Sequence, residues 1–408
     1  MTDRIDSAPV APAHQRMHVI DAIRAVALYG VIAMNLIGMV GALVAPEVLR
    51  WAGPADMAAI VFDLVILQGK ARSAFALLFG VGFGLMLARS RAKGHGFVAF
   101  YLRRMTGLLV IGLFNLAFLF FGDILILYAL LGMLLILFRD LPDKALVRLG
   151  LVLVIVPPLL AGLVELVTRA PMPNLAGLSP AAADGFMAPS LPLYRSPRYL
   201  DFVTANLRYY RDHHLAETGY AVTYDLGVLG LFLIGLWIAR NDVLADVARW
   251  RPLLRRLAWT CIPLGLVLSL VHATRRMGIE AEGAAYALVT AAYVGLPVMA
   301  FGYVSALALW FSRGGGAGPR MQAALAPMGR LALTGYLGSN LIGGFLWYGW
   351  GLGQLGRWNV AAINLFALGL FVIFCVASAL WLRAFRFGPV EWLWRCWSYA
   401  RWQPMRRR

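Results

Sequence analysis

The sequence predicts an all-α, polytopic membrane protein, a helix bundle of about ten transmembrane helices. Of its 408 residues, 61% are hydrophobic and only 14% are charged, whereas soluble domains hold about 45–50% apolar and roughly 25% charged residues. Long apolar runs bounded by arginines also recur along the whole chain, and no polar stretch is long enough to form a separate soluble domain. Lipid is therefore the expected solvent.

The apolar runs give the expected order of the helices. A helix needs about 20 apolar residues to cross the hydrocarbon core of a bilayer. The shorter apolar segment 57–68 is predicted to form a half-helix that is either re-entrant or interfacial. The ten predicted spans are residues 18–43, 73–88, 104–121, 123–138, 147–168, 221–239, 257–273, 285–311, 331–350 and 359–382.

The basic residues predict the orientation. Cytoplasmic loops of membrane proteins carry an excess of Lys and Arg. With ten spans and a cytoplasmic N-terminus, 25 of the 37 Lys and Arg lie in segments that face the cytoplasm. We therefore expect a bacterial cytoplasmic (inner) membrane protein with both termini in the cytoplasm. Because these loops explain the net charge of +17, the expected partners are membrane lipids, and no nucleic acid is expected.

The same pattern divides the chain into one membrane domain and two tails. Residues 1–17 form a cytoplasmic tail, and residues 18–382 form a single transmembrane domain. The longest outer segment, 169–220, is predicted to be an extracytoplasmic cap with short helices. In residues 383–408 tryptophans alternate with arginines, which suits the headgroup region, so we expect a cationic aromatic tail with an interfacial helix beginning near Pro389.

Small residues recur at four-residue spacing in two of the spans. Such stripes allow helix backbones to approach closely in lipid. We expect them to mediate packing, and not to form a nucleotide-binding turn. The two stripes are Ala76, Gly80, Gly84 and Ala88, and Gly335, Ser339 and Gly343.

A polar stripe on the first span is the first candidate site. Ionisable groups inside a span are costly, and each is by default a functional candidate. Asp21 and Arg24 are one helical turn apart, and Asn35 falls on the same face of the helix at about 100° per residue. The stripe is predicted to face the interior of the bundle. Either it forms a site, or Asp21 and Arg24 only neutralise each other near the interface.

Other polar residues near the spans also allow two interpretations. Lys70 and Arg72 either anchor to lipid headgroups or belong to a site. Asp123 follows Gly122 in a tight turn, where Asp ordinarily caps locally, and Tyr128 follows it by about one and a half turns. Asp225, at the start of a span, is either a site residue or a simple charge complement.

Histidines and cysteines give little support for known chemistry. None of the six histidines lies in the middle of a predicted span, and no Ser/His/Asp arrangement is visible. The three cysteines are isolated, without metal-ligand or redox spacing. We therefore expect no metal or redox cofactor.

Several motifs resemble the YeiB-like family of bacterial inner-membrane proteins, which is described as a domain of unknown function. The C-terminal motif is the longest and most specific. This family is in turn similar in architecture to transmembrane acyltransferases such as heparan-alpha-glucosaminide N-acetyltransferase. The matching motifs lie in residues 16–27, 69–80, 122–132, 329–336 and 381–395.

The resemblance implies acyl transfer from a cytoplasmic acyl-CoA donor to a lipid or glycan acceptor. By this analogy, Arg16 and Arg24 bind an acyl-CoA phosphate, and Asp123 lies near the acceptor. Asn115 stands where family members often carry His, and Asn cannot act as a general base. Either the activity is lost, or His213 or His214 supplies the base.

Three functions thus remain open: acyl transfer, transport or lipid handling without covalent chemistry, and a non-catalytic scaffold or sensor. The candidate catalytic residues are Asp21, Asp123, His213 and His214. The candidate substrate-binding residues are Arg16, Arg24, Asn35, Lys70, Arg72, Asn115, Tyr128, Asp225 and Arg330.

Overall fold

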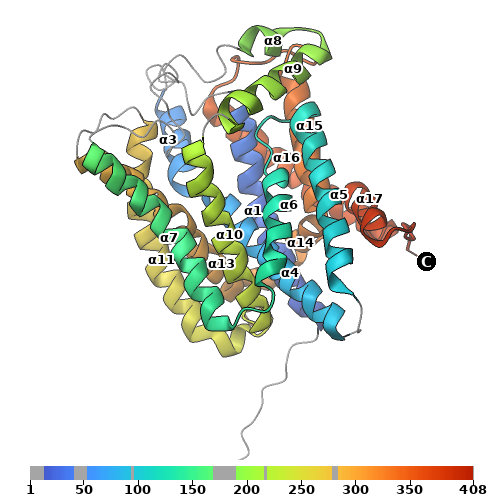
Figure 1. Cartoon of the computed structure of the whole chain (residues 1–408). Coiled ribbons are helices and arrows are strands. Elements are labelled where there is room, and N and C mark those ends of the chain that lie inside the picture. Colours follow the sequence, from blue (N-terminus) through green and yellow to red (C-terminus); the bar gives the residue numbers. More distant parts are fainter. Residues whose placement is uncertain are drawn as a thin grey trace, which may run out of the picture.

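The chain folds into one bundle of helices, with a helix near the C-terminus at its side (Figure 1). The computed structural model describes residues 13–40, 53–92, 96–168, 190–215, 218–277 and 284–407. Within these ranges no strand forms, and the only β pairing is an isolated antiparallel bridge between Phe385 and Arg406. The predicted all-α membrane bundle is confirmed.

The helices follow the predicted order. The N-terminal half comprises α1 (Ala13–Met39), α3 (Pro54–Phe62), the π-helix η1 (Asp63–Leu67), α4 (Lys70–Ala92), α5 (Phe97–Phe118), α6 (Leu125–Leu135), η2 (Ile136–Phe138) and α7 (Asp143–Thr168). The C-terminal half comprises α8 (Leu191–Arg195), α9 (Tyr199–Tyr209), η5 (Tyr210–Leu215), α10 (Thr218–Arg240), α11 (Val247–Arg276), α12 (Ala284–Ala291), η6 (Ala292–Val294), α13 (Gly295–Phe311), α14 (Ala317–Arg330), α15 (Ala332–Trp347), α16 (Val360–Ala384) and α17 (Pro389–Tyr399).

Eight helical stretches in the described part of the chain are long and apolar enough to cross a membrane. Two further predicted spans form shorter helices, Leu125–Phe138 and α15, which has 16 residues. Every predicted span therefore corresponds to a helix, whereas the number of helices that cross the bilayer stays a prediction. The start of the third span was wrong: α5 begins at Phe97, so Arg104 lies two turns inside the helix.

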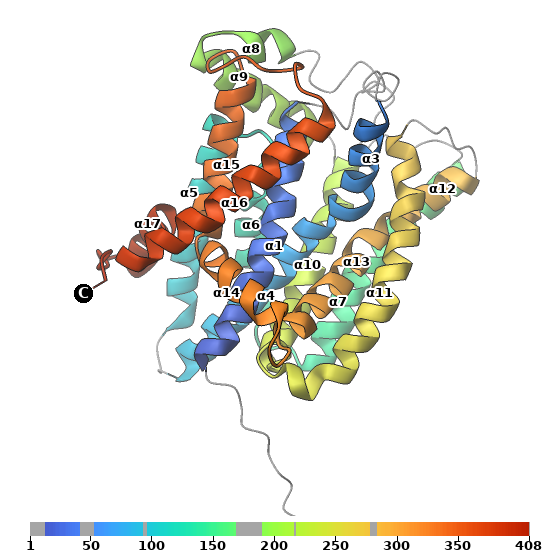
Figure 2. The same cartoon turned by 180° about the vertical axis from the view of Figure 1, so that it is seen from behind.

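The predicted half-helix is present, but it does not form a separate re-entrant or interfacial segment. α3 and η1 lead directly into α4, so that Pro54–Ala92 is one apolar stretch of 39 residues. Figure 2 shows α3 and α4 following one another along the bundle. The stretch is broken after Gln68, where Gly69 has a φ of +75°. The second span is thus a discontinuous helix.

Helices form in the described parts of the predicted cap and where the C-terminal helix was predicted, while the outer position of the cap stays a prediction. In residues 190–215 of the predicted cap, α8 and α9 lie at one end of the bundle (Figure 1). The remaining cap residues 169–189 and 216–217 lie outside the described ranges. The predicted interfacial helix is α17, which begins at Pro389.

Both small-residue stripes lie at helix contacts. A Cβ atom on Gly80 would lie 2.2 Å from the carbonyl oxygen of Phe232 in α10, and one on Gly84 would lie 2.5 Å from the Cβ of Ala239. Similarly, a Cβ on Gly343 would lie 2.6 Å from Leu36 of α1. Gly80 thus allows α4 to approach the backbone of α10, and Gly343 leaves room for side chains of α1 against α15.

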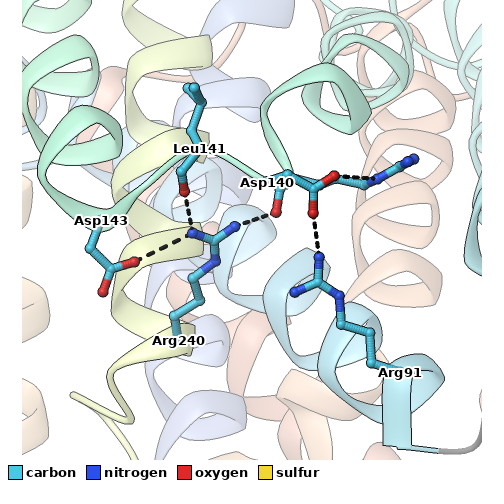
Figure 3. Close-up of polar contacts among 6 residues, drawn as sticks. Arg91, Asp140, Leu141, Asp143 and Arg240 are labelled. Carbon is cyan, nitrogen blue, oxygen red and sulfur yellow. Dashed lines mark hydrogen bonds and ion pairs between the residues drawn. The ribbon is translucent and has the colours of Figure 1, made fainter.

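At the end of the bundle opposite α8 and α9, an ion cluster joins three elements (Figure 3). Arg91 of α4 contacts Asp140 at 2.5 Å. Arg240 of α10 donates to the carbonyl oxygen of Leu141 at 2.6 Å and contacts Asp143 at 3.4 Å. The exposed ion pairs contribute little on their own, whereas the backbone contact of Arg240 fixes the α6–α7 turn to α10.

Substitution of Gly80 tests the contact between α4 and α10. We expect Gly80→Ala to lower the stability by about 1–3 kcal/mol, because the added methyl group overlaps backbone atoms. Gly82→Ala is the matched control, since a Cβ there has no atom within 4 Å. The measurement is the apparent melting temperature in detergent. Equal melting of both variants would mean that the two helices do not pack at Gly80.

Candidate functional site

The bundle encloses a cavity of about 260 Å³. Six parts of the chain line it: α1, α4, α5, the start of α6, the α14–α15 junction and α17. The wall is mostly apolar, with a few polar groups at its ends. The lining residues are Arg24, Leu28, Val31, Phe75, Leu78, Phe79, Gly82, Met86, Arg104, Met105, Leu108, Ile124, Leu125, Tyr128, Gly329, Arg330, Ala332, Leu333, Tyr336, Glu391 and Trp394.

One part of the cavity wall is cationic. Arg24 forms an ion pair with Asp21 at 2.7 Å and also donates to the carbonyl oxygen of Gly329 at 3.3 Å. Arg330 is exposed and donates to the carbonyl oxygen of Arg386. Asp21 and Arg24 therefore neutralise each other, yet Arg24 still lines the cavity. The planar guanidinium of arginine binds phosphates and carboxylates through two parallel N–H donors, as a bidentate partner.

A third arginine reaches the cavity from α5. The guanidinium of Arg104 stacks on the ring of Trp394 at 3.5 Å from the ring centroid, and the indole nitrogen of Trp394 donates to the carbonyl oxygen of Arg104 at 2.6 Å. Trp394 thus forms part of the cavity wall, where its ring covers the guanidinium of Arg104.

A buried polar network begins at Asp123. One carboxylate oxygen accepts a hydrogen bond from the backbone N–H of Ile126 at 2.8 Å, which caps α6. The other oxygen accepts from the side-chain amide of Asn115 at 2.6 Å. The same amide nitrogen lies 3.4 Å from the hydroxyl of Tyr336, which lines the cavity. Asp123 is thus both a local cap and a member of an interhelical network.

The network continues across the bundle to α1. Asn340 of α15 donates to the carbonyl oxygen of the Asn115 side chain at 3.0 Å, and Asn35 donates to Asn340 at 2.9 Å. Asn115, Asn340 and Tyr336 are all buried. Because lipid offers no hydrogen-bond partners, these side chains satisfy one another. Asn115 is the link between Asp123 and Tyr336.

A second group of polar contacts surrounds the start of α4. Tyr128, buried and lining the cavity, donates its hydroxyl proton to the carbonyl oxygen of Arg72 at 2.9 Å. The guanidinium of Arg72 lies 3.8 Å from the ring centroid of Tyr224 and donates to Tyr293 at 3.3 Å. Asp225 is half-buried beside Tyr224. Arg72 therefore contacts groups inside the protein and does not anchor to headgroups.

Lys70 is also inside the protein, although it does not line the cavity. Its side chain is 1% exposed, and its ammonium group donates to the carbonyl oxygen of Leu64 at 3.0 Å. The interpretation of Lys70 as a headgroup anchor was therefore wrong. The side chains of Arg16, His213 and His214 lie outside the described part of the structure, so their proposed roles stay predictions.

Glu391 joins α17 to the start of α15. Its carboxylate accepts the backbone N–H groups of Leu333 and Thr334 at 2.8 and 2.9 Å, and the hydroxyl of Thr334 at 2.5 Å. A carboxylate is favourable at the positive end of a helix. Burial raises the pKa of Glu391 above its usual value, although these hydrogen bonds act in the opposite direction.

Sequence reasoning missed four of the residues that shape this site. Arg104 is the first residue of a predicted span, and neither it nor Glu391 was among the candidate site residues. Tyr336 belonged to a matching motif without a predicted role. Asn340 has no distinguishing motif, and its position one turn after Tyr336 was the only available signal.

The eight long apolar helical stretches in the described residues define a polytopic helical membrane protein, and three of them line the cavity. Residues 238–401 match the family "Protein of unknown function (DUF418)". The chain is 27% identical to "Uncharacterized protein YxaH" of Bacillus subtilis (strain 168), over 97% of each chain. It is 28% identical to "Uncharacterized protein YeiB" of Escherichia coli (strain K12), over 93% of this chain and 96% of the relative. No solved structure matches the chain.

The chain is thus similar to YeiB and YxaH over nearly its whole length, and its C-terminal part matches the DUF418 family. This confirms the family resemblance seen in the motifs. The likeness to transmembrane acyltransferases has no support in these comparisons and stays a prediction.

The cap formed by Glu391 can be tested by two substitutions. We expect Glu391→Ala to destabilise the protein by about 1–2 kcal/mol, because the N–H groups of Leu333 and Thr334 lose their acceptor. Glu391→Gln keeps one oxygen that can accept from these N–H groups, so it should destabilise the protein less than Glu391→Ala does. The readout is the apparent melting temperature in detergent. If Glu391→Ala melts like the wild type, the junction of α15 and α17 does not depend on this carboxylate.

Proposed function

We propose that the protein transfers an acyl group from an acyl-CoA donor to a lipid or glycan acceptor. The observation that carries the proposal is the chemistry of the cavity. Arg24, Arg330 and Arg104 provide cationic groups, the aliphatic and aromatic wall accommodates an acyl chain, and Tyr336 connects the wall to Asp123. A largely apolar pocket with a few convergent polar groups is typical of small-molecule sites.

The proposed roles follow from the charges. Arg24 and Arg330 bind the phosphate groups of the donor, because arginine suits phosphate as a bidentate partner. In the reaction the acceptor oxygen or nitrogen forms a bond to the acyl carbon, and the thioester C–S bond breaks. The proton of the acceptor passes to Asp123 and then to the released thiolate. Asn115 and Tyr336 position Asp123 through the network.

The proposal includes an orientation in the bacterial inner membrane with both termini in the cytoplasm. It is supported by the distribution of basic residues, since 25 of 37 lie in the segments assigned to the inside. Donor access from the cytoplasm then occurs at the end of the bundle where α1 begins. Membrane lipids surround the exposed apolar faces of the helices.

The orientation predicts the behaviour of C-terminal reporter fusions. A green fluorescent protein fused after Arg408 should fluoresce in bacterial cells, and alkaline phosphatase at the same place should be inactive. The matched control places alkaline phosphatase in the cap, after Ser190, where it should be active. An active enzyme after Arg408 and an inactive one after Ser190 would reverse the orientation.

Ligand-induced stabilisation tests the donor site. A ligand that binds only the folded protein raises its stability by about 2.7 kcal/mol at a concentration 100 times its Kd. Palmitoyl-CoA and acetyl-CoA should therefore raise the melting temperature of the wild type. Arg24→Ala should remove this shift, whereas Arg139→Ala should keep it, because Arg139 pairs with Asp140 away from the cavity.

Release of free CoA distinguishes binding from catalysis. Asp123→Asn should keep the acyl-CoA shift and lose thiol release in the presence of membrane lipids, measured with a thiol reagent. The absence of any shift with either acyl-CoA would overturn the proposal. A shift with phospholipid alone would instead support a lipid carrier without covalent chemistry.

A further inference from the structure

A second buried polar group lies in the broken second span, apart from the cavity. Asp63 begins the π-helix η1 and is fully buried. One carboxylate oxygen accepts a hydrogen bond from the side-chain amide of Asn364 in α16 at 2.8 Å. The other carboxylate oxygen is enclosed and has no hydrogen-bond partner among the described residues, and the same holds for the amide oxygen of Asn364. Two unpartnered acceptors thus belong to one hydrogen-bonded pair.

An ionised Asp63 would be costly at this position. A charge inside a span requires a partner or water, and Asp63 forms no ion pair with any described residue. The helices α11, α3, α1 and α4 pack against η1. Their titratable side chains include His272 of α11, Asp56 of α3, Tyr29 of α1 and Lys70 of α4, and Tyr303 of α13 also contacts η1. His272 lies 3.2 Å from the carbonyl oxygen of Val289, and Asp56 accepts the backbone N–H of Ala361. The hydroxyl of Tyr303 lies 3.4 Å from the carbonyl oxygen of Ile66. The ammonium of Lys70 donates to the carbonyl oxygen of Leu64. In the part of the chain that the structure describes, none of these side chains forms a hydrogen bond with the carboxyl group of Asp63.

One proton satisfies both unpartnered oxygens. A neutral carboxyl group has one O–H donor, and an amide oxygen can accept it. If the proton is on the free oxygen of Asp63, it can be donated to Asn364 while the Asn364 amide donates in return. The acid and the amide then form a ring of two hydrogen bonds. A hydrogen-bonded pair of this kind removes the cost of two unpaired buried acceptors.

The backbone around Asp63 departs from a regular α-helix. In η1 the N–H of Gln68 donates to the carbonyl oxygen of Asp63, five residues earlier. This π-helical spacing leaves carbonyl oxygens without the N–H partner that a regular α-helix would give them. Lys70 occupies one of them, that of Leu64, and so its ammonium lies at the negative end of the α3–η1 segment. The acid and the ammonium therefore belong to the same helix break but have different partners.

We propose that Asp63 and Asn364 form a proton-binding site inside the membrane domain, at the break of the second span. Its ligand is a proton, held by Asp63 and shared with the amide oxygen of Asn364. When the proton leaves, the carboxylate attracts the ammonium of Lys70, which then releases the carbonyl oxygen of Leu64. Proton binding is thus linked to the conformation of the break. This proposal does not depend on acyl transfer.

Infrared spectroscopy tests the site on the purified full-length protein in lipid nanodiscs. At neutral pH the wild type minus Asp63→Asn difference spectrum should contain the C=O band of a protonated carboxyl group, which moves to lower frequency in D₂O. Asp201→Asn is the matched control, because Asp201 lies in the first turn of α9 and its carboxylate accepts the hydroxyl of Ser196. Its substitution should leave the protonated-carboxyl band in place.

Asn364→Leu provides a second readout. It removes the amide acceptor and should move the Asp63 carboxyl band to higher frequency without removing it. If Asp63→Asn fails to fold, the band shift in Asn364→Leu still tests whether Asp63 is protonated and bonded to Asn364. A difference spectrum with only carboxylate bands would overturn the proposal, as would an unmoved band in Asn364→Leu. Loss of the band on addition of sodium chloride at constant pH would mean that the site binds sodium, and would also overturn it.

Discussion

The arrangement of this protein depends on the fact that lipid cannot hydrogen-bond to buried polar groups. Each polar side chain placed inside the bundle must find its partner in another helix. Asp123, Asn115, Asn340 and Asn35 therefore join the α5–α6 turn, α15 and α1 through hydrogen bonds between side chains. In water such contacts would be exchangeable with solvent. Here they fix which helices are neighbours, and through Tyr336 they also contact the wall of the cavity.

The cationic side of the cavity is held by backbone contacts at the α14–α15 junction. A Cβ atom at Gly329 would lie 1.7 Å from the carbonyl oxygen of Asp21, so only glycine lets α14 approach α1 this closely. The same approach places the carbonyl oxygen of Gly329 beside Arg24. Glu391 then holds the start of α15 from the opposite side. Two motifs far apart in the sequence, around residues 329–336 and 389–391, thus form one structural unit.

Hydropathy was sufficient to predict the helices, because a span must be long and apolar whatever its neighbours are. It was not sufficient for the position of Arg104, since a charge that is covered by Trp394 has the same sequence signature as a charge in a loop. The network partners of Asp123 could not be predicted either. Asn340 is 225 residues from Asn115, and nothing local to either residue indicates the contact. The polar stripe of α1 was predictable because helical periodicity alone places its members on one face.

The break in the second span and the cavity share the first turn of α4. Lys70 belongs to the break through its contact with Leu64. Two residues later, the carbonyl oxygen of Arg72 accepts the hydroxyl of Tyr128, and Phe75 lines the cavity one turn further on. The break and this part of the cavity wall are therefore built on the same helical turn, and the hydrogen bond from Tyr128 to Arg72 ties the start of α6 to it.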